Sequence, residues 1–273
     1  WSVPHYEKML DINSELLAVN TKMYELTREK KYLETAKRIV SYIMGTLADK
    51  NGGLYASQDA DGEEAYYGLS LEERKKKEAP HVDKTIYADL NGLGLNALIK
   101  YYEATKDKKI RIFVERALDL FLKKYYSIQT GFAHCLDKKP VFLGLLTDNY
   151  RMGYALLSAY RAFRKRAYLA KAKETADFII RNFFDKKFGG LNDIASNNGH
   201  GRMKIRMKKI KDNSRLAMFF LELAKASRQT KYKNIARQGL QYFSGKYVNW
   251  GFYSSEYALA VDMLLNEKLG KKK

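Results

Sequence analysis

Four carboxylates stand close together in the stretch NGGLYASQDADGEEAYYG, residues 51–68. Asp59, Asp61, Glu63 and Glu64 fall within six positions, after a glycine pair and before a tyrosine pair. In a ligand pocket a carboxylate accepts hydrogen bonds from hydroxyls, and a suitably spaced pair can act as general acid and base. Asp59 and Asp61 are therefore candidate catalytic residues. The alternatives are a turn in which each aspartate bonds its own backbone, or a metal loop.

His5 is a third candidate catalytic residue, and Glu7 beside it is a candidate ligand-binding residue. His5 follows Pro4, so we expect it at a helix entrance. An imidazole there is suited to moving a proton near neutral pH, although a histidine that only caps or packs the helix is an open alternative. The remaining histidines are weaker candidates: His81, His134 and His200.

Aspartate, asparagine and lysine recur where later helices are expected to begin. The candidate ligand-binding residues in these places, with one tyrosine of the acidic stretch, are Tyr67, Lys84, Asp89, Asn91, Asp148, Asn149, Asp212 and Asn213. Lys84 could neutralise an acidic ligand or pair with the acidic stretch. Asp and Asn are also good helix N-caps, so these residues could equally cap helices or brace one hairpin against the next.

These residues are placed by a repeat that runs along the whole chain. An asparagine opens each unit, at Asn13, Asn91, Asn149 and Asn213, and a Gly-containing turn closes it, at Gly53, Gly131, Gly190 and Gly251. The distances between them are 40, 40, 41 and 38 residues. Four spacings that agree this well indicate a repeated supersecondary unit.

The repeated unit reads as a pair of helices joined by a short polar turn. Residues 169–183 place Ala172, Ala176, Ile179 and Phe183 on one helical face, and no proline interrupts the long periodic segments. A last helix over about 255–269 brings the expected number to about nine. We therefore predict an all-α fold in which residues 1–273 form a single domain. Its αα-hairpins curve into an (α/α)6-type toroid that is short of a full ring of twelve helices.

The chain is strongly basic, with a formal net charge of +19, but its basic residues are spread widely. The densest basic groups include residues 202–211, RMKIRMKKIK, which read as a short ribbon or a basic loop. A basic nucleic-acid-binding role for this segment is an alternative, but the pattern does not favour it, since aromatics are not interleaved with the charges. Cys135 is the only cysteine, and no apolar run approaches the roughly 20 residues that cross a bilayer. We expect a cytoplasmic protein that does not enter the membrane, with no cofactor and no metal site, because HxH, HExxH and EF-hand spacings are missing.

Three segments carry a resemblance to a known family. WSVPHYEKML, GGLYASQDADGEEAYYG and HVDKTIYADLNGL resemble motifs of the thioredoxin-domain-containing, spermatogenesis-associated (YyaL-type) proteins. That family joins a thioredoxin-like domain to a C-terminal (α/α)6 toroid, which is similar to six-hairpin glycosidases and sugar 2-epimerases. This chain has no CxxC pair, and Ile12 and Leu90 stand where the family has aspartate and tryptophan.

The resemblance implies a carbohydrate-binding or carbohydrate-processing module that holds a sugar-like ligand at the loop-bearing end of the toroid. In that reading Asp59 and Asp61 accept hydrogen bonds or form an acid/base pair, His5 shuttles a proton and Lys84 is a charge partner. The alternative is a non-catalytic helical scaffold that docks a thioredoxin-like partner.

Overall fold

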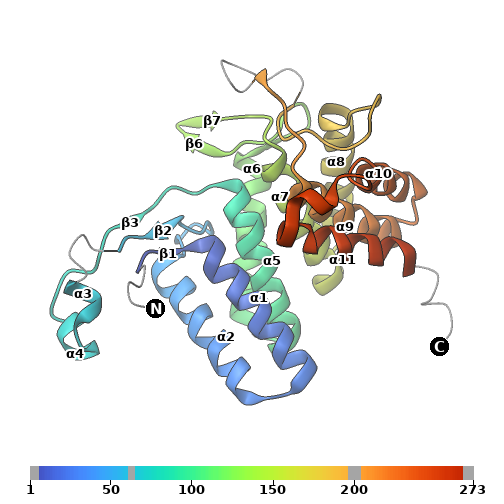
Figure 1. Ribbon diagram of the computed structural model, residues 1–273. Helices are drawn as coiled ribbons and strands as arrows, with labels where there is room; N and C mark the ends of the chain where they lie inside the picture. The colour runs from blue at the N-terminus through green and yellow to red at the C-terminus, as the bar shows by residue number, and fades with distance from the viewer. Residues whose placement is uncertain (1–5, 61–64, 196–203, 267–273) are drawn as a thin grey trace. The chain divides into compact units, whose positions relative to one another are not determined.

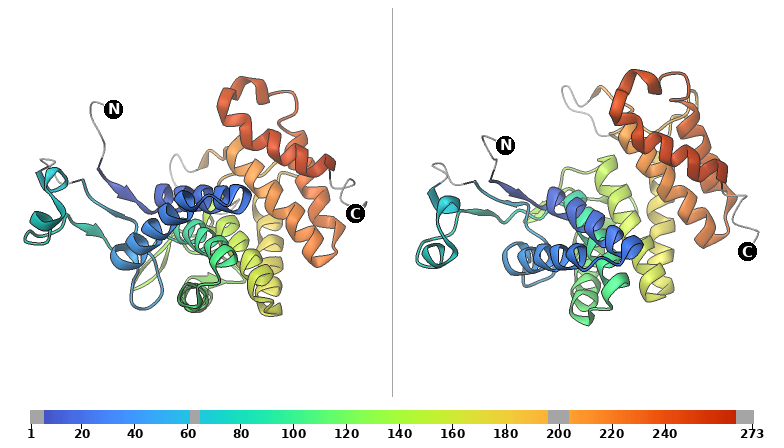
Figure 2. Two further views of the ribbon diagram at one scale, coloured as in Figure 1. Left: turned by 90° about the horizontal axis from the view of Figure 1, so that it is seen from below. Right: turned by 60° about the horizontal axis from the view of Figure 1, so that its bottom comes forward.

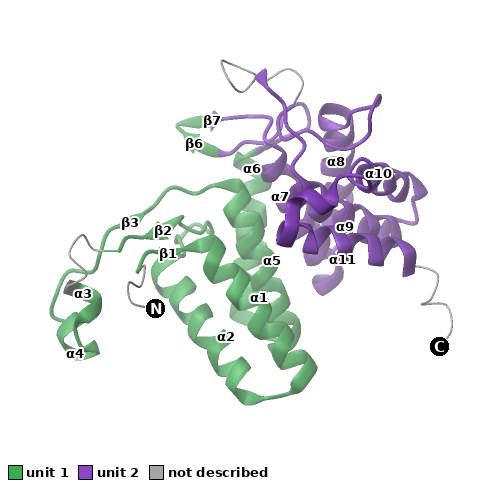
Figure 3. Cartoon of the chain, viewed as in Figure 1, with its two compact units in different colours: residues 1–125, 135–139 green, residues 126–134, 140–273 purple. Residues whose placement is uncertain are grey.

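The computed structural model describes residues 6–60, 65–195 and 204–266, and Figure 1 labels their helices and strands. The chain divides into two compact units, which Figure 3 colours separately. Unit 1 contains residues 1–125 and 135–139, and unit 2 contains residues 126–134 and 140–273. Among the described residues no helix is long and apolar enough to cross a membrane.

Unit 1 is built on two helical hairpins. Its helices are α1 (Leu10–Thr27), α2 (Lys30–Tyr42) with its π-helical extension η1 (Ile43–Leu47), α3 (Ala65–Gly68), α4 (Leu71–Arg74), α5 (Ala88–Thr105) and α6 (Lys108–Lys124). Helix α1 packs against both α2 and α5, and α5 packs against α6 (Figure 2). Helix α6 buries apolar side chains at helical spacing, such as Ile110, Phe113 and Ala117.

A small antiparallel sheet in unit 1 joins segments that are far apart in the sequence. Its order is β1 (Lys8–Met9), β2 (Ser57–Gln58), β3 (Val82–Asp83). Lys8 pairs with Gln58, and Ser57 pairs with Asp83. The sheet therefore brings the start of α1, the beginning of the acidic stretch and the approach to α5 to one place.

Unit 2 continues the hairpin pattern. Its helices are α7 (Leu146–Phe163), α8 (Arg166–Phe183), α9 (Ile210–Ser227), α10 (Thr230–Gln241), the 3-10 helix η3 (Tyr247–Ser254) and α11 (Ser255–Leu265). The chain passes from α6 to α7 through the short strands β4 (Tyr126–Ser127), β5 (Gly131–Phe132), β6 (Cys135–Asp137) and β7 (Lys139–Val141). Helix α9 contacts α7, α8, α10 and α11, and so forms the centre of this unit.

The repeat of the sequence is a repeat of structure. The first helix of each hairpin, α1, α5, α7 and α9, has 18 residues. Each ends at a basic residue with left-handed backbone: Arg28, Lys106, Arg164 and Arg228. A left-handed residue at this position ends a helix and turns the chain, so the partner helix begins two residues later. Nine α-helices of 11 to 18 residues occupy the described ranges, as the sequence predicts.

Candidate functional site

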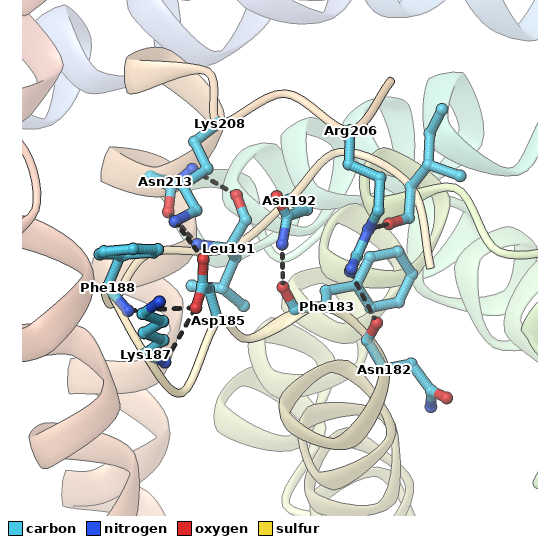
Figure 4. Close-up of polar contacts among 11 residues, drawn as sticks. Asn182, Phe183, Asp185, Lys187, Phe188, Leu191, Asn192, Arg206, Lys208 and Asn213 are labelled. Atoms are coloured by element: carbon cyan, nitrogen blue, oxygen red, sulfur yellow. Dashed lines mark hydrogen bonds and ion pairs between the residues drawn. The ribbon is translucent and has the colours of Figure 1, made fainter. Parts of the chain in front are cut away.

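Three of the repeat asparagines attach a hairpin to the turn that precedes it: Asn91, Asn149 and Asn213. Asn213 of α9 forms hydrogen bonds with the backbone of Leu191, which follows the glycine turn of the preceding hairpin (Figure 4). The Leu191 backbone N–H donates to Asn213 Oδ1 at 2.7 Å, and Asn213 Nδ2 donates to the Leu191 carbonyl at 2.9 Å. Asn213 is 1% exposed, so both backbone groups of Leu191 are satisfied in a buried place where an unpaired polar group is costly.

The same two-bond arrangement occurs at Asn91, and its acceptor bond recurs at Asn149. Asn91 accepts from the Leu54 backbone N–H at 2.8 Å and donates to the Leu54 carbonyl at 2.9 Å. Asn149 accepts from the Phe132 backbone N–H at 3.0 Å. Asn91 and Asn149 are both fully buried. Of the two structural roles open to these asparagines, bracing between hairpins is the one observed.

N-capping is not observed for these asparagines, because each is the fourth residue of its helix. The N-cap positions are occupied by Met9, Tyr87, Leu145 and Lys209, none of which makes a side-chain cap. The amide nitrogen of each repeat asparagine donates to the carbonyl of that N-cap residue, at 2.8 to 3.0 Å. The capping interpretation is therefore wrong in its geometry, since the side chain points back along its own helix and across to the turn.

His134 and Asp148 form a pair in unit 2. His134 lies three residues after Gly131, and Asp148 lies in the first turn of α7. His134 Nδ1 is 2.9 Å from Asp148 Oδ1. The Asp148 side chain is fully buried and that of His134 is 26% exposed. A buried carboxylate on one ring nitrogen fixes the orientation of an imidazole that solvent reaches.

A second polar contact lies at the same end of α7. The Tyr150 hydroxyl donates to Asp212 Oδ1 at 3.1 Å and so links α7 to the first turn of α9. Burial, reinforced by the Asp212 charge, raises the pKa of Tyr150 to about 12, so its hydroxyl stays protonated at neutral pH. Arg151 Nε contacts the same hydroxyl oxygen at 3.4 Å. The predicted residues Asp148 and Asp212 therefore both lie at the amino ends of neighbouring helices of unit 2.

The candidate residues of unit 1 are placed differently from one another. The Asp59 side chain is exposed, while its backbone is fixed: its N–H donates to His81, and its carbonyl accepts from the Tyr67 hydroxyl at 3.0 Å. Tyr67 and Lys84 line a common hollow. Glu7 and Asp89 are half-buried, Glu7 just before β1 and Asp89 in the first turn of α5. His5 and Asp61 lie outside the described residues.

The basic segment 202–211 is a loop in its described part, residues 204–209, and α9 begins at Ile210. Arg206 donates to the Ile194 carbonyl at 2.9 Å and to the Asn182 carbonyl at 3.2 Å (Figure 4). Lys208 forms an ion pair of 2.8 Å with Asp185. Two of the basic side chains of this segment are thus engaged in holding the loop, which does not favour a nucleic-acid interface.

Asp185 accepts hydrogen bonds within the turn that leads to Leu191, the residue bonded by Asn213. Its Oδ1 accepts from the backbone N–H groups of Lys187 and Phe188, and its Oδ2 accepts from Lys208 (Figure 4). These contacts, the Lys208 hydrogen bond first, lower the pKa of Asp185 to about 2. Asp49 has a similar place in unit 1, where it accepts from the Asn51 N–H.

His134 was ranked among the weaker candidates from the sequence, although the structure pairs it with Asp148. It occurs in no recognised spacing, and its partner Asp148 is 14 residues away. The available signal was its place in the repeat, since it lies three residues after Gly131, the glycine of the turn that closes its unit.

Comparison with solved structures defines the class. The fold is that of the six-hairpin α/α toroids found among carbohydrate enzymes. Cellobiose 2-epimerase from Bacillus thermoamylovorans matches with a TM-score of 0.72 and 12% identity, over 97% of this chain and 76% of that one. A GH76 α-mannanase from Bacteroides thetaiotaomicron matches with a TM-score of 0.71 and 16% identity, over 97% of this chain and 70% of that one. Identities this low establish the fold alone.

Sequence comparison identifies the relatives. Part of the chain is homologous to spermatogenesis-associated protein 20, which confirms the resemblance to that family. To the mouse (Mus musculus) protein it is 34% identical over 82 residues, which are 27% of this chain and 10% of that protein. The match spans about a tenth of the length of this curated relative. No protein-family model matches the chain.

Proposed function

We propose that this chain binds and processes a sugar-like small molecule, with His134 as the group that moves a proton. The observation that carries the proposal is the His134–Asp148 pair, a partly exposed imidazole on a fully buried carboxylate in the first turn of α7. The similarity in fold to enzymes named for carbohydrate substrates supports the choice of ligand class.

The chemistry follows from the hydrogen bond. When Asp148 accepts the Nδ1 proton, the imidazole is held in the tautomer whose lone pair is on Nε2. That nitrogen can take a proton from a carbon or hydroxyl of the ligand and return it, and an imidazole does this best near neutral pH. Asp148 lies in the first turn of α7, where the helix dipole favours a negative charge.

The test separates binding from chemistry. Cellobiose, mannose and mannobiose are each incubated with the protein in D2O, and proton NMR follows both saturation transfer and the loss of carbon-bound hydrogen. We expect saturation transfer from at least one sugar and deuterium incorporation next to its anomeric carbon. His134→Gln should abolish the incorporation and leave saturation transfer intact, and Asp148→Asn should reduce it by about 100-fold or more.

The matched control is Asp119→Asn, which removes an exposed carboxylate on α6. It should leave both signals unchanged. No saturation transfer from any of the three sugars overturns the proposed ligand class. Incorporation that persists in His134→Gln overturns the role of His134.

A further inference from the structure

A hollow of about 910 Å³ lies in unit 1. Its walls come from the end of α2, strand β1, the α3–α4 segment and the chain leading into β3. The β1–β2–β3 sheet draws these segments together, since Lys8 pairs with Gln58 and Gln58 pairs with Val82. The volume suits a small molecule, because ligand sites commonly measure about 300–1,000 Å³.

The lining of this hollow is strongly cationic. Among the residues that the structure describes, Lys8, Arg74, Lys75 and Lys84 line it, against one carboxylate, that of Glu78. Lys75 also pairs with Glu72 at 2.7 Å, but both side chains are largely exposed, and such pairs contribute little. A concave wall with an excess of one charge concentrates ligands of the opposite charge.

Two of the cations are held in place by their surroundings. Lys8 Nζ is buried and lies 3.4 Å from the centroid of the Tyr67 ring. Arg74 Nε donates to the Leu69 carbonyl at 2.9 Å, and its Nη2 donates to the Tyr67 carbonyl. Both acceptors are neutral carbonyls. These hydrogen bonds therefore orient the Arg74 guanidinium but do not neutralise its positive charge. A preorganised cation loses little entropy when a ligand binds.

The remaining walls offer neutral hydrogen bonds and an apolar surface. The Tyr42 hydroxyl bonds Gln58 at 3.1 Å, and Gln58 Nε2 bonds the Pro80 carbonyl at 3.2 Å, so the back of the hollow is fixed. Burial raises the pKa of Tyr42, which keeps its hydroxyl protonated. Tyr66 and the exposed Leu71 supply an aromatic ring and an aliphatic side chain.

We propose that this hollow binds a small organic anion, a carboxylate or phosphate ester whose charged group meets Arg74 and Lys84 and whose ring lies against Tyr66 and Leu71. The excess of positive charge selects the anionic group, and the aromatic and aliphatic wall selects an organic body over an inorganic ion. The inference goes beyond the proposed function and does not rest on it, because it concerns unit 1 alone.

The test is titration calorimetry of the full chain with phenyl phosphate, benzoate, inorganic phosphate and phenol. We expect phenyl phosphate or benzoate to bind at least tenfold more tightly than phenol and than inorganic phosphate, and the stronger of the two identifies the anionic group. Lys84→Met should raise the Kd of that probe about tenfold, since a charge-assisted hydrogen bond is lost.

Lys37→Met is the matched control, because Lys37 is an exposed lysine of α2 that does not line the hollow. It removes the same unit of charge from a chain of net charge +19, and it should leave the Kd within twofold of the wild type. An equal loss of affinity in Lys37→Met and Lys84→Met would mean diffuse charge attraction and would overturn the site. Phenol binding as tightly as both anionic probes would overturn it as well.

Discussion

Asn213 and Leu191 are joined by two hydrogen bonds in opposite directions, 2.7 Å into the Asn213 oxygen and 2.9 Å out of its nitrogen. A side-chain amide here does what a neighbouring strand would do, pairing both the N–H and the C=O of one buried residue. The same pairing of Asn91 with Leu54 shows that this is how a helical hairpin is attached to the turn before it.

Asn213→Ala should therefore loosen the turn around Leu191. It leaves the Leu191 N–H and C=O buried without these partners, at a cost of about 2–3 kcal/mol. Hydrogen exchange should show faster exchange in residues 185–195. Asn13→Ala is the control, because Asn13 is only half-buried and bonds the carbonyl of Met9 in its own helix. Equal effects of the two changes would contradict a bracing role for Asn213.

The spacing of the asparagines was enough to predict the hairpins, but not what the amides do. Helical periodicity and turn composition are local properties, so the nine long helices could be placed from the sequence. The partner of Asn213 is 22 residues away and is a backbone group, which carries no residue-type signal. Aspartate and asparagine are favoured both at N-caps and in such braces, so composition could not separate the two.

The candidate sites were only partly foreseeable for the same reason. Asp148 was predicted from its place at a helix start, whereas His134 belongs to a loop whose path depends on the Gly131 turn. In unit 1 the cationic hollow depends on sheet pairing that brings Lys8 beside residues about 60 to 75 positions later. Two-residue strands leave almost no periodic pattern in a sequence, so this juxtaposition required the structure.

Gly131→Ala should be strongly destabilising. Gly131 has a φ of 71°, and a Cβ there would lie 2.2 Å from Asn149 Oδ1 and 2.4 Å from the Phe178 ring. The substitution strains the backbone and displaces the amide that holds Phe132, so we expect a loss of about 2–4 kcal/mol. Urea unfolding monitored by circular dichroism measures it. Gly245→Ala, where a Cβ meets nothing within 4 Å, should change stability by less than about 1 kcal/mol.

Arg228→Gly should stabilise the protein. Arg228 ends α9 with a φ of 57°, a left-handed conformation that glycine adopts without steric cost. The expected gain is about 0.5–1 kcal/mol, seen as a higher urea midpoint. Arg237→Gly, at an exposed position inside α10, should instead cost about 1 kcal/mol. A loss of stability in Arg228→Gly would show that the arginine side chain contributes more than the backbone strain costs.

The Asp185–Lys208 pair makes a pH-dependent contribution to stability. The pKa of Asp185 is lowered from 3.8 to about 2 in the folded protein, chiefly by the Lys208 hydrogen bond. The unfolded chain therefore binds more protons than the folded chain between these two values. The contribution is fully present above about pH 4 and is lost as the pH falls towards 2.

Asp185→Asn tests this contribution, because it keeps an oxygen that accepts from the turn backbone but removes the charge. The difference in urea midpoint between wild type and Asp185→Asn should consequently shrink as the pH is lowered from 5 to 2.5. Lys208→Met should move the Asp185 pKa upward, so that the carboxylate protonates at a higher pH in a carbon-13 NMR titration. A midpoint difference that stays constant over this range would show that the turn is held by its backbone bonds and not by the ion pair.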